Sequence, residues 1–486
     1  MIDAKEIRGT FSSFKEFTNT FLLVHFDGKI IQLMDGITED RLVIALSSPC
    51  NLPGQFIASP AMSDGTGDTM ARCVYGVIND LGLLDGVQAL VFDTTASNTG
   101  RWNGSSTLFG AMVERPLLWL ACRHHISELF IKHANIEIRG ESKGPDDSLF
   151  KEFKKFFGFI NLDIRLAWVR PNSVRDWRSQ RANEVLLWAD QHMEKMTWPR
   201  EDYRELLELV VTFLGGAVKR VHRGQVTIIP VQIRKPGALH RARFMASCLY
   251  LLKICLFRDQ FITDNQNIQD AMILGEYIAL IHAPYFLKSP LAISAPRNDR
   301  DLWVDLHDYR NCFRANMVQS HMIEAVQESV MNHLWYLTEE LVIFGLFDDG
   351  LDNAERNAMA AQLMSYPNLG NFEPGKPVFP IDLMVRNPRL ETFVGPRSWL
   401  LFNKLNANGV WLQMDVSDWE SDAEYIRMNA CLRDLKVVND LAERCIKDIQ
   451  EYADLAKDSQ YREDILIVAT DHRGVFQDLR KRALAV

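Results

Sequence analysis

The sequence predicts an α/β protein in which a mixed sheet is interrupted by a large all-α insertion. Two short apolar runs, Phe21–Asp27 and Val87–Asp93, have the β-branched and aromatic bias of buried strands, and each ends on an aspartate. A helical pattern separates them, and helical patterns rich in Leu, Trp and Phe then fill most of residues 140–389. Strands that alternate with helices and are followed by a long helical stretch favour this class.

The first strands are expected to form hairpins. Phe21–Asp27, Lys29–Met34 and Arg41–Ser47 read as three successive strands with short polar separators, among them Asp35-Gly36. Such short connections are typical of antiparallel pairs. Apolar residues then recur at spacings of three and four, which predicts a helix over 68–84; they are Met70, Val74, Val77, Ile78 and Leu81.

The elements that follow complete a recognisable order. After the strand that ends at Asp93, Ser105–Val113 reads as a helix, Leu117–Ala121 as a strand and Cys122–His133 as the start of a helix. Three strands, helix, strand, helix, strand and helix correspond to the ribonuclease H-like layout. In that layout the first strand and the strand after the first helix each carry an acid. Asp27 and Asp93, 66 residues apart (93 minus 27), occupy these two places.

Four segments are expected along the chain. Residues 1–19 are a leader, 20–140 the N-terminal part of the core, 141–390 the helical insertion, and 391–486 the C-terminal part of the core with a dimerisation-type end. A Pro/Gly-rich stretch over 366–380 leads out of the insertion. The last long helix is predicted over Glu424–Leu455, because apolar residues from Val438 to Ile449 share one face.

Composition excludes several classes of protein. The residues are 47% hydrophobic and 24% charged, as in ordinary globular proteins. The longest apolar stretches reach Lys219 or Lys253 before they are long enough to span a membrane, so no membrane partner is expected. Eight cysteines without C-x-x-C spacing favour a reducing, intracellular location and exclude an ordinary zinc-finger module.

Positive charge is concentrated in one segment of this acidic chain, whose formal net charge is -9. The 50 residues from Leu209 to Arg258 contain no Asp or Glu. A phosphate backbone is the partner that such a segment favours, because neutralising phosphates releases counterions. The alternative is a solvated face paired with acids from elsewhere in the chain. The basic residues are Lys219, Arg220, Arg223, Arg234, Lys235, Arg241, Arg243, Lys253 and Arg258.

The two strand-terminal aspartates are candidate metal ligands. Carboxylates held side by side by strand pairing provide the oxygen ligands that Mg²⁺ prefers. The alternative is that each Asp simply begins a turn, as Asp often does. Asp35 is the reserve candidate for the first position.

Two further motifs resemble elements of the hAT-superfamily DNA transposases. The segment Leu118-Trp-Leu-Ala-Cys122-Arg-His-His125-Ile-Ser-Glu-Leu129 resembles the C-x-x-H-x-L-N-L element that follows their second catalytic aspartate, with Ser-Glu in place of Leu-Asn. The segment Asp440-Leu-Ala-Glu443-Arg-Cys-Ile resembles the Glu-Arg-x-Phe-Ser element that carries their third acid, with Ile and Lys in place of Phe-Ser. The order of these motifs after Asp27 and Asp93 strengthens the resemblance.

The resemblance implies a cut-and-paste DNA transposase ancestry with a ribonuclease H-like core. It also implies that Asp27, Asp93 and Glu443 are catalytic residues and metal ligands. Three converging carboxylates would repel one another unless cations neutralise them, so two Mg²⁺ or Mn²⁺ ions are expected to support in-line displacement. The alternatives for the third acid are Asp440 on nearly the same helical face and the pair Glu339-Glu340.

Three other side chains are expected near the site. Cys122 and His125 could form half a zinc site, but no second pair has ligand spacing, so packing and hydrogen bonding are the favoured roles. Trp102 follows Asp93 on the same loop and is a candidate for stacking on a nucleic-acid base, although most tryptophans are core residues.

The sequence thus predicts a nuclear, metal-dependent enzyme that cleaves and transfers DNA strands and forms a homo-oligomer, with no small-molecule substrate. The alternative is a catalytically silent, transposase-derived protein that binds DNA or protein. Intact acids favour the enzyme. Active hAT transposases carry an N-terminal zinc-binding recognition domain, whereas this chain starts close to the first core strand, which favours the alternative and a domesticated or truncated descendant.

Overall fold

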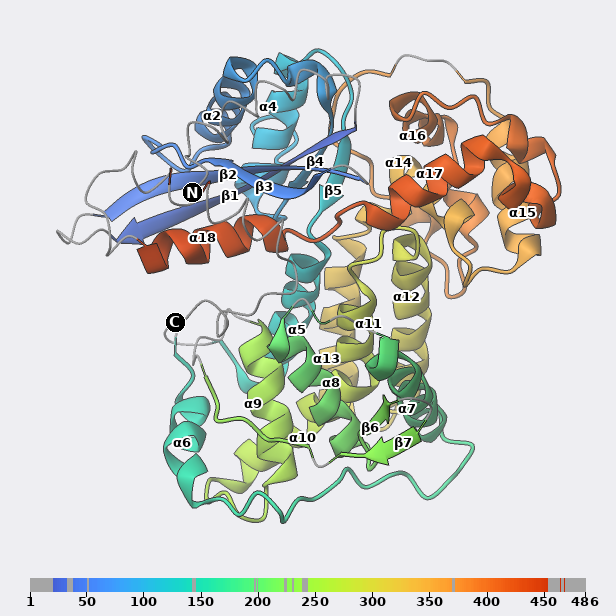
Figure 1. Ribbon diagram of the computed structural model, residues 1–486. Coiled ribbons are helices and arrows are strands. Elements are labelled where there is room, and N and C mark those ends of the chain that lie inside the picture. The colour runs from blue at the N-terminus through green and yellow to red at the C-terminus, as the bar shows by residue number, and fades with distance from the viewer. Residues whose placement is uncertain are drawn as a thin grey trace. The chain divides into compact units, whose positions relative to one another are not determined.

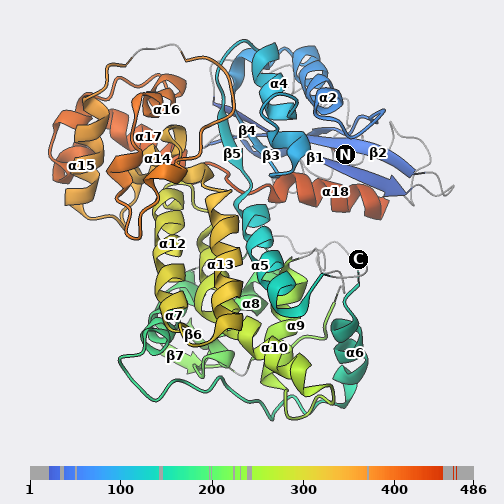
Figure 2. The same ribbon diagram turned by 180° about the vertical axis from the view of Figure 1, so that it is seen from behind.

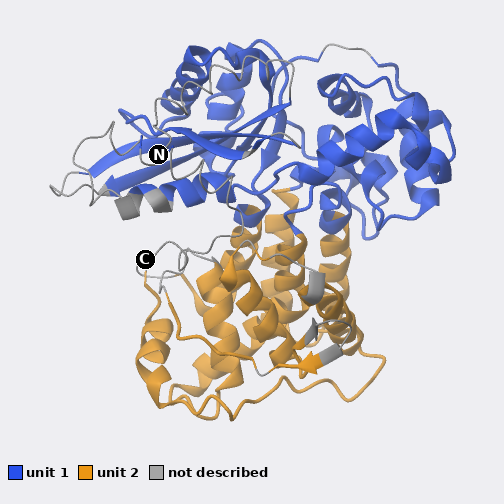
Figure 3. Cartoon of the chain, viewed as in Figure 1, with its two compact units in different colours: residues 1–125, 289–299, 334–486 blue, residues 126–288, 300–333 orange. Residues whose placement is uncertain are grey.

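A computed structural model describes most of the chain, and its contacts divide into two compact units (Figure 3). Unit 1 comprises residues 1–125, 289–299 and 334–486, and unit 2 comprises residues 126–288 and 300–333. The described residues are 21–32, 38–49, 52–141, 146–195, 198, 200–222, 225–229, 231–237, 244–368, 372–452, 464 and 467. The predicted ligand Asp35 lies outside the described residues.

Unit 1 contains a five-stranded mixed sheet in the order β3-β2-β1-β4-β5 (Figure 1). Strand β1 (Leu22–Gln32) pairs antiparallel with β2 (Thr38–Ser48), which pairs antiparallel with β3 (Leu52–Ala58). On its other side β1 pairs parallel with β4 (Val87–Phe92), which pairs parallel with β5 (Leu118–Ala121). The sheet and its helices confirm the predicted mixed α/β class.

The division of the first strands was wrong. The described parts of the predicted strands Phe21–Asp27 and Lys29–Met34 belong to the single strand β1, because the ladder with β2 continues through Gly28 to Gln32. The third strand is β3, in a segment for which no element was predicted. Its Pro53 is tolerated because β3 is an edge strand. Gly54 has a φ of 149°, and a Cβ there would lie 2.9 Å from a methyl carbon of Leu441.

Helices cover both faces of this sheet. Helices α2 (Gly67–Asp80) and α4 (Ser105–Met112) pack together on one face, and α18 (Asp440–Tyr452) packs against β1, β2 and β3 on the other (Figures 1 and 2). Both α2 and α4 were predicted within a few residues of their observed bounds. The buried side of α18 is formed by Ala442, Cys445, Ile446 and Ile449.

The start of α2 lies against the loop that follows β4. A Cβ on Gly67 would stand 2.1 Å from the carbonyl oxygen of Asn103 and 2.6 Å from that of Ser97. Both neighbours are backbone atoms, which cannot rotate away as a flexible side chain can. The absence of a side chain at Gly67 therefore allows helix and loop to pack in direct contact.

We expect Gly67→Ala to destabilise the protein by about 3 kcal/mol, the upper end for overpacking in a filled site. Gly76→Ala in the same helix is the matched control. A Cβ there meets nothing within 4 Å, so it should stabilise by about 0.5–1 kcal/mol through helix propensity. Urea unfolding of the two variants measures both values. Equal stability of the two variants would contradict the close packing of the loop.

The predicted helix over Glu424–Leu455 is wrong, because the chain forms two helices there. Helix α17 (Ala423–Asp434) ends before an extended segment, and α18 begins at Asp440. The adjacent β-branched residues Val437 and Val438 favour extended backbone. A long-range bond fixes this conformation: the backbone N–H of Arg123 donates to the carbonyl of Val437 at 3.0 Å.

Further helices of unit 1 surround an aromatic core. Trp411, the centre of this core, contacts the rings of Phe347, Phe402, Trp419 and Tyr425. Residues 334–390, expected within the insertion, belong to unit 1. The helices are α14 (Glu339–Val342), α15 (Asn353–Met364) and α16 (Trp399–Lys404). The short helix α3 (Ala96–Thr99) follows β4 and contacts α4.

Unit 2 is largely helical, like the insertion that the sequence predicts, and also contains a short hairpin of β6 (Lys219–His222) and β7 (Gln225–Ile228). Helix α5 (Arg123–Arg139) begins in unit 1 and continues here. Among the described residues, no helix combines the length and apolar character needed to cross a membrane. The other helices are α6 (Ser148–Phe156), α7 (Trp177–Lys195), α8 (Glu201–Phe213), α9 (Phe244–Leu256), α10 (Asn265–Tyr277), α11 (Ala283–Lys288), α12 (Ala295–Asn311) and α13 (Met317–Met331).

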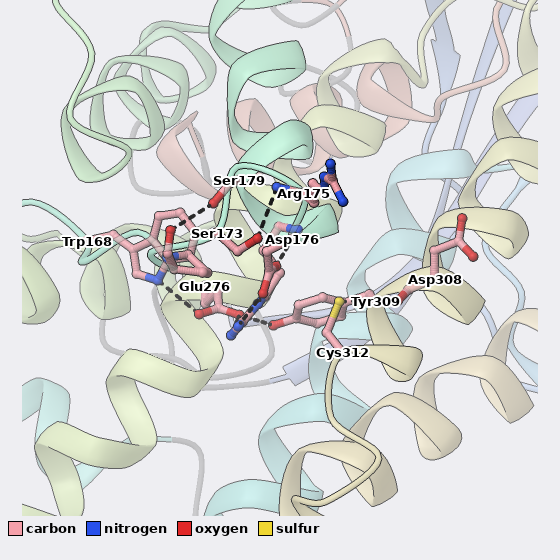
Figure 4. Close-up of polar contacts among 11 residues, drawn as sticks. Trp168, Ser173, Arg175, Asp176, Ser179, Glu276, Asp308, Tyr309 and Cys312 are labelled. Carbon is pink, nitrogen blue, oxygen red and sulfur yellow. Dashed lines mark hydrogen bonds and ion pairs between the residues drawn. The ribbon is translucent and has the colours of Figure 1, made fainter.

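A buried carboxylate joins three segments of unit 2 (Figure 4). Glu276 on α10 accepts hydrogen bonds from the indole N–H of Trp168 at 2.9 Å and from the hydroxyl of Tyr309 on α12 at 3.1 Å. The guanidinium of Arg178 on α7 lies 3.8 Å from Glu276. Burial raises the pKa of Glu276, while Arg178 and these donors lower it. The cluster is satisfied internally and therefore has a structural role.

Candidate functional site

Asp93 follows the last residue of β4, and a tight turn holds its carboxylate. The backbone N–H of Thr95 donates to Oδ1 at 3.1 Å and the Thr95 hydroxyl at 2.7 Å. The side-chain amide of Asn98 donates to the same oxygen at 2.6 Å. Within the described part of the chain these side-chain bonds all end on Oδ1, so one oxygen is fixed and Oδ2 takes no part in the turn.

Asp27 lies at the same end of the sheet as Asp93. In the parallel pair of β1 and β4, His25 is opposite Val91, and the two aspartates each come two residues later. Burial raises the pKa of Asp27 to about 8, and the negative charges of Asp93 and Glu443 contribute to the rise. The structure thus brings the charges of all three predicted acids together.

Glu443 lies in the first turn of α18. The rival candidates have other neighbours. Asp440 lies 2.9 Å from Nδ1 of His124. Glu340 is buried in an ion pair with Arg397, and Glu339 accepts the backbone N–H of Arg397 at 3.1 Å.

The three carboxylates match a hard divalent cation in donor type. Oxygen ligands are what Mg²⁺ and Mn²⁺ prefer, and a cation would relieve the repulsion that raises the pKa of Asp27. In the described ranges no group of three or more His, Cys, Asp or Glu side chains is arranged so that it could hold a metal ion. Asp93 and Glu443 act on Asp27 through their charge, and the three side chains do not form a ligand set as they stand.

Cys122 and His125 lie beside these acids. Cys122 is buried, and its sulfur accepts the backbone N–H of Asn439 at 3.1 Å. Burial, followed by the charge of Glu443, raises the pKa of the Cys122 thiol well above its usual value. Its hydrogen bond to Asn439 and its burial agree with the predicted role in packing and hydrogen bonding. His125 is close enough for its positive charge to lower the pKa of Asp27.

Trp102 is a surface residue near the Asp93 turn. It lies between α3 and α4 and is 74% exposed. The guanidinium of Arg101 lies 5.0 Å from the centre of its ring. The indole is therefore outside the core, where an aromatic ring and a cation are both open to a ligand.

The acid-free basic segment is partly neutralised by acids from other helices of unit 2. Lys219 pairs with Asp190 at 2.5 Å, and Arg234 pairs with Glu201 at 2.7 Å. Lys253 is buried and pairs with Glu205 at 2.7 Å, and Arg258 donates to backbone carbonyls. Lys235 is exposed. Arg223, Arg241 and Arg243 lie outside the described residues, as does the side chain of Arg220.

Sequence reasoning missed Asn439 as a polar residue that connects the motifs, and it did not predict that His124 contacts Asp440. Asn439 donates its side-chain N–H to the carbonyl of Phe26 at 3.1 Å, and His124 contacts Asp440. The sequence did contain a signal for this region. Asn439-Asp440, a pair of residues that favour helix starts, lies inside a helical pattern that otherwise reads as continuous.

No protein-family model matches the sequence. No curated protein matches it either. The likeness of its motifs to hAT-superfamily transposases thus remains a prediction, and the proposed function is built on the residues of the site.

Proposed function

We propose that this protein cleaves and joins DNA strands in a metal-dependent reaction, through a ribonuclease H-like core of the hAT transposase type. The observation that supports the proposal is the environment of Asp27, whose pKa is raised first by burial and then by the negative charges of Asp93 and Glu443. These residues come from a strand, a turn and a helix, and 350 residues separate the last two (443 minus 93). Repulsive carboxylates gathered in this way are expected of a cation site.

The sheet topology supports the same core. The order β3-β2-β1-β4-β5, with antiparallel and then parallel pairs, agrees with the layout predicted from the order of elements. Asp27 inside β1 and Asp93 directly after β4 are the acids that we assign to the two acid positions of that layout. We therefore assign Asp27 and Asp93 as the first two ligands and Glu443 as the third.

The chemistry follows from the donor set. Two bound Mg²⁺ or Mn²⁺ ions would supply charge neutralisation and activation of a water or 3′-hydroxyl. The carboxylates of this chain would hold and orient that site, and the hydrogen bonds from Thr95 and Asn98 keep one Asp93 oxygen in place. A fixed ligand reduces the reorganisation that the reaction requires.

Features on the surface support DNA as the substrate. Trp102 and Arg101 provide a ring and a cation near the Asp93 turn, a combination suited to an unpaired base and its phosphate. In unit 2, Lys235 of the basic segment is exposed and is therefore a candidate contact for a DNA phosphate. The proposal includes a nuclear location and assembly as a homo-oligomer.

Nicking of supercoiled plasmid DNA tests this function. We expect the purified protein to convert supercoiled to open-circular DNA with Mn²⁺ or Mg²⁺ present and to stop when EDTA removes the metal. The physical reason is that the site carries uncompensated negative charge without cations. Gel electrophoresis measures the products. Metal-independent nicking would contradict the proposal, and DNA binding without nicking at any metal concentration would instead support the catalytically silent alternative.

A further inference from the structure

The segment 437–440, which leads into α18 and includes its first residue, is tied to β1 and to the residues at the start of α5. We call residues 437–440 the hinge segment. Its Val437 carbonyl accepts the backbone N–H of Arg123 at 3.0 Å. Its Asn439 donates through the backbone to the sulfur of Cys122 at 3.1 Å, and through the side chain to the carbonyl of Phe26 at 3.1 Å. These bonds reach the residue directly before Asp27.

The fourth contact of the hinge segment is between the side chains of His124 and Asp440, which are both largely shielded from water. Nδ1 of His124 lies 2.9 Å from Oδ1 of Asp440. The side chain of His124 is 2% exposed and that of Asp440 is 17% exposed. A hydrogen bond to a charged group that is shielded from water is stronger and more directional than one between neutral groups.

Asp440 of this pair is the first residue of α18, which packs against β1, β2 and β3. Helix α17 does not continue into α18, so no unbroken backbone fixes the rotation of α18. The sheet-facing side of α18 is formed by Ala442, Cys445, Ile446 and Ile449, and apolar contacts are not directional. Asp440 and Glu443 are three residues apart and therefore neighbours on one helical face. Fixing Asp440 thus sets where the Glu443 carboxylate lies.

We propose that His124 and Asp440 are a pair of positioning residues that aim Glu443 at the cation site. This inference rests on the proposed function for its catalytic consequence. Neither residue is assigned to the metal or to the substrate. The first turn of α5, which also carries His125, thus helps to hold the carboxylate of Glu443 in place.

The test compares His124→Ala with His124→Asn. Asparagine places its amide N–H where Nδ1 stands and keeps the bond to Asp440, whereas alanine removes it. We expect His124→Ala to weaken Mn²⁺ binding and slow nicking by about 10- to 100-fold, as loss of a partner behind a metal ligand does. His124→Asn should stay within about threefold of the unmodified protein. Titration calorimetry with Mn²⁺ alone and plasmid nicking are the two readouts.

A matched control separates positioning from general destabilisation. Asp348→Asn weakens another buried pair of unit 1, in which Asp348 lies 2.6 Å from Arg297. We expect this variant to lower the melting temperature while leaving Mn²⁺ affinity unchanged. The inference is overturned if Asp348→Asn weakens Mn²⁺ binding as much as His124→Ala does. It is also overturned if His124→Ala and His124→Asn are equally impaired, or if His124→Ala behaves as the unmodified protein.

The two readouts also distinguish this inference from the proposed function. If the unmodified protein binds Mn²⁺ without nicking DNA, strand cleavage fails, and the Mn²⁺ affinities of the two His124 variants still decide the positioning role. If it binds no Mn²⁺, there is no site for Glu443 to complete, and the positioning role is overturned as well.

Discussion

Asp93→Ala should abolish metal-dependent nicking and leave the fold intact. Asp93 supplies the carboxylate at the end of β4, and its Oδ1 is already held by Thr95 and Asn98. A bound cation lowers the free energy of the charged transition state by several kcal/mol. Losing this ligand should therefore slow nicking by about 10³-fold. Plasmid nicking at saturating Mn²⁺ measures the loss.

The control for this variant is Asp80→Ala. Asp80 is an exposed acid at the end of α2, in the same unit as the site. It should nick at the rate of the unmodified protein. Circular dichroism and thermal unfolding of both variants establish that they are folded. Substantial nicking by a folded Asp93→Ala protein would remove Asp93 from the site.

Asp27→Asn should stabilise the metal-free protein while abolishing its activity. Burial and the charges of Asp93 and Glu443 raise the pKa of Asp27 to about 8. A carboxyl whose pKa is raised by folding contributes stability below its unfolded pKa of about 4, and that contribution is lost as the pH rises to about 8. The uncharged side-chain amide of the Asp27→Asn variant avoids this loss of folding stability at pH 8. We expect the loss to be about 2 kcal/mol after solvent screening.

The measurement is thermal unfolding at pH 5 and pH 8 in EDTA. A gain of about 2 kcal/mol corresponds to a rise of about 4–8 °C in melting temperature for a domain of this size range. The gain should be larger at pH 8 than at pH 5, and Mn²⁺ should stabilise the unmodified protein more than the variant. Asp80→Asn is the control, with little change expected. A lower melting temperature for Asp27→Asn at pH 8 would contradict repulsion among the three acids.

The apolar runs in the sequence pointed to both Asp27 and Asp93, although only Asp93 follows the end of its strand and Asp27 lies inside β1. The β-branched bias of these runs predicted the strands, and parallel pairing of β1 with β4 then placed both acids at one end of the sheet. Strand β3 was not predicted, and its Pro53 and Gly54 are residues that strands generally disfavour. Only its position at the sheet edge makes these residues compatible with a strand.

Long-range contacts account for the remaining differences. The break between α17 and α18 is accompanied by a hydrogen bond from Arg123 to Val437, more than 300 residues away along the chain (437 minus 123). Local periodicity in the sequence cannot reveal such a contact. The ion pairs of Lys219 with Asp190 and of Arg234 with Glu201 also join separate elements. Charge counts along the chain could identify the basic segment but not its partners.

The wide spacing of the three acids has a consequence during synthesis of the protein. Asp93 leaves the ribosome 350 residues before Glu443 (443 minus 93), which corresponds to roughly 20–70 seconds of translation at ordinary rates. Throughout that interval the nascent chain carries two of the acids and lacks the third. A chain interrupted before α18 therefore lacks one of the three carboxylates of the proposed cation site. Under the proposed function, incomplete translation products would lack a complete site for cutting DNA.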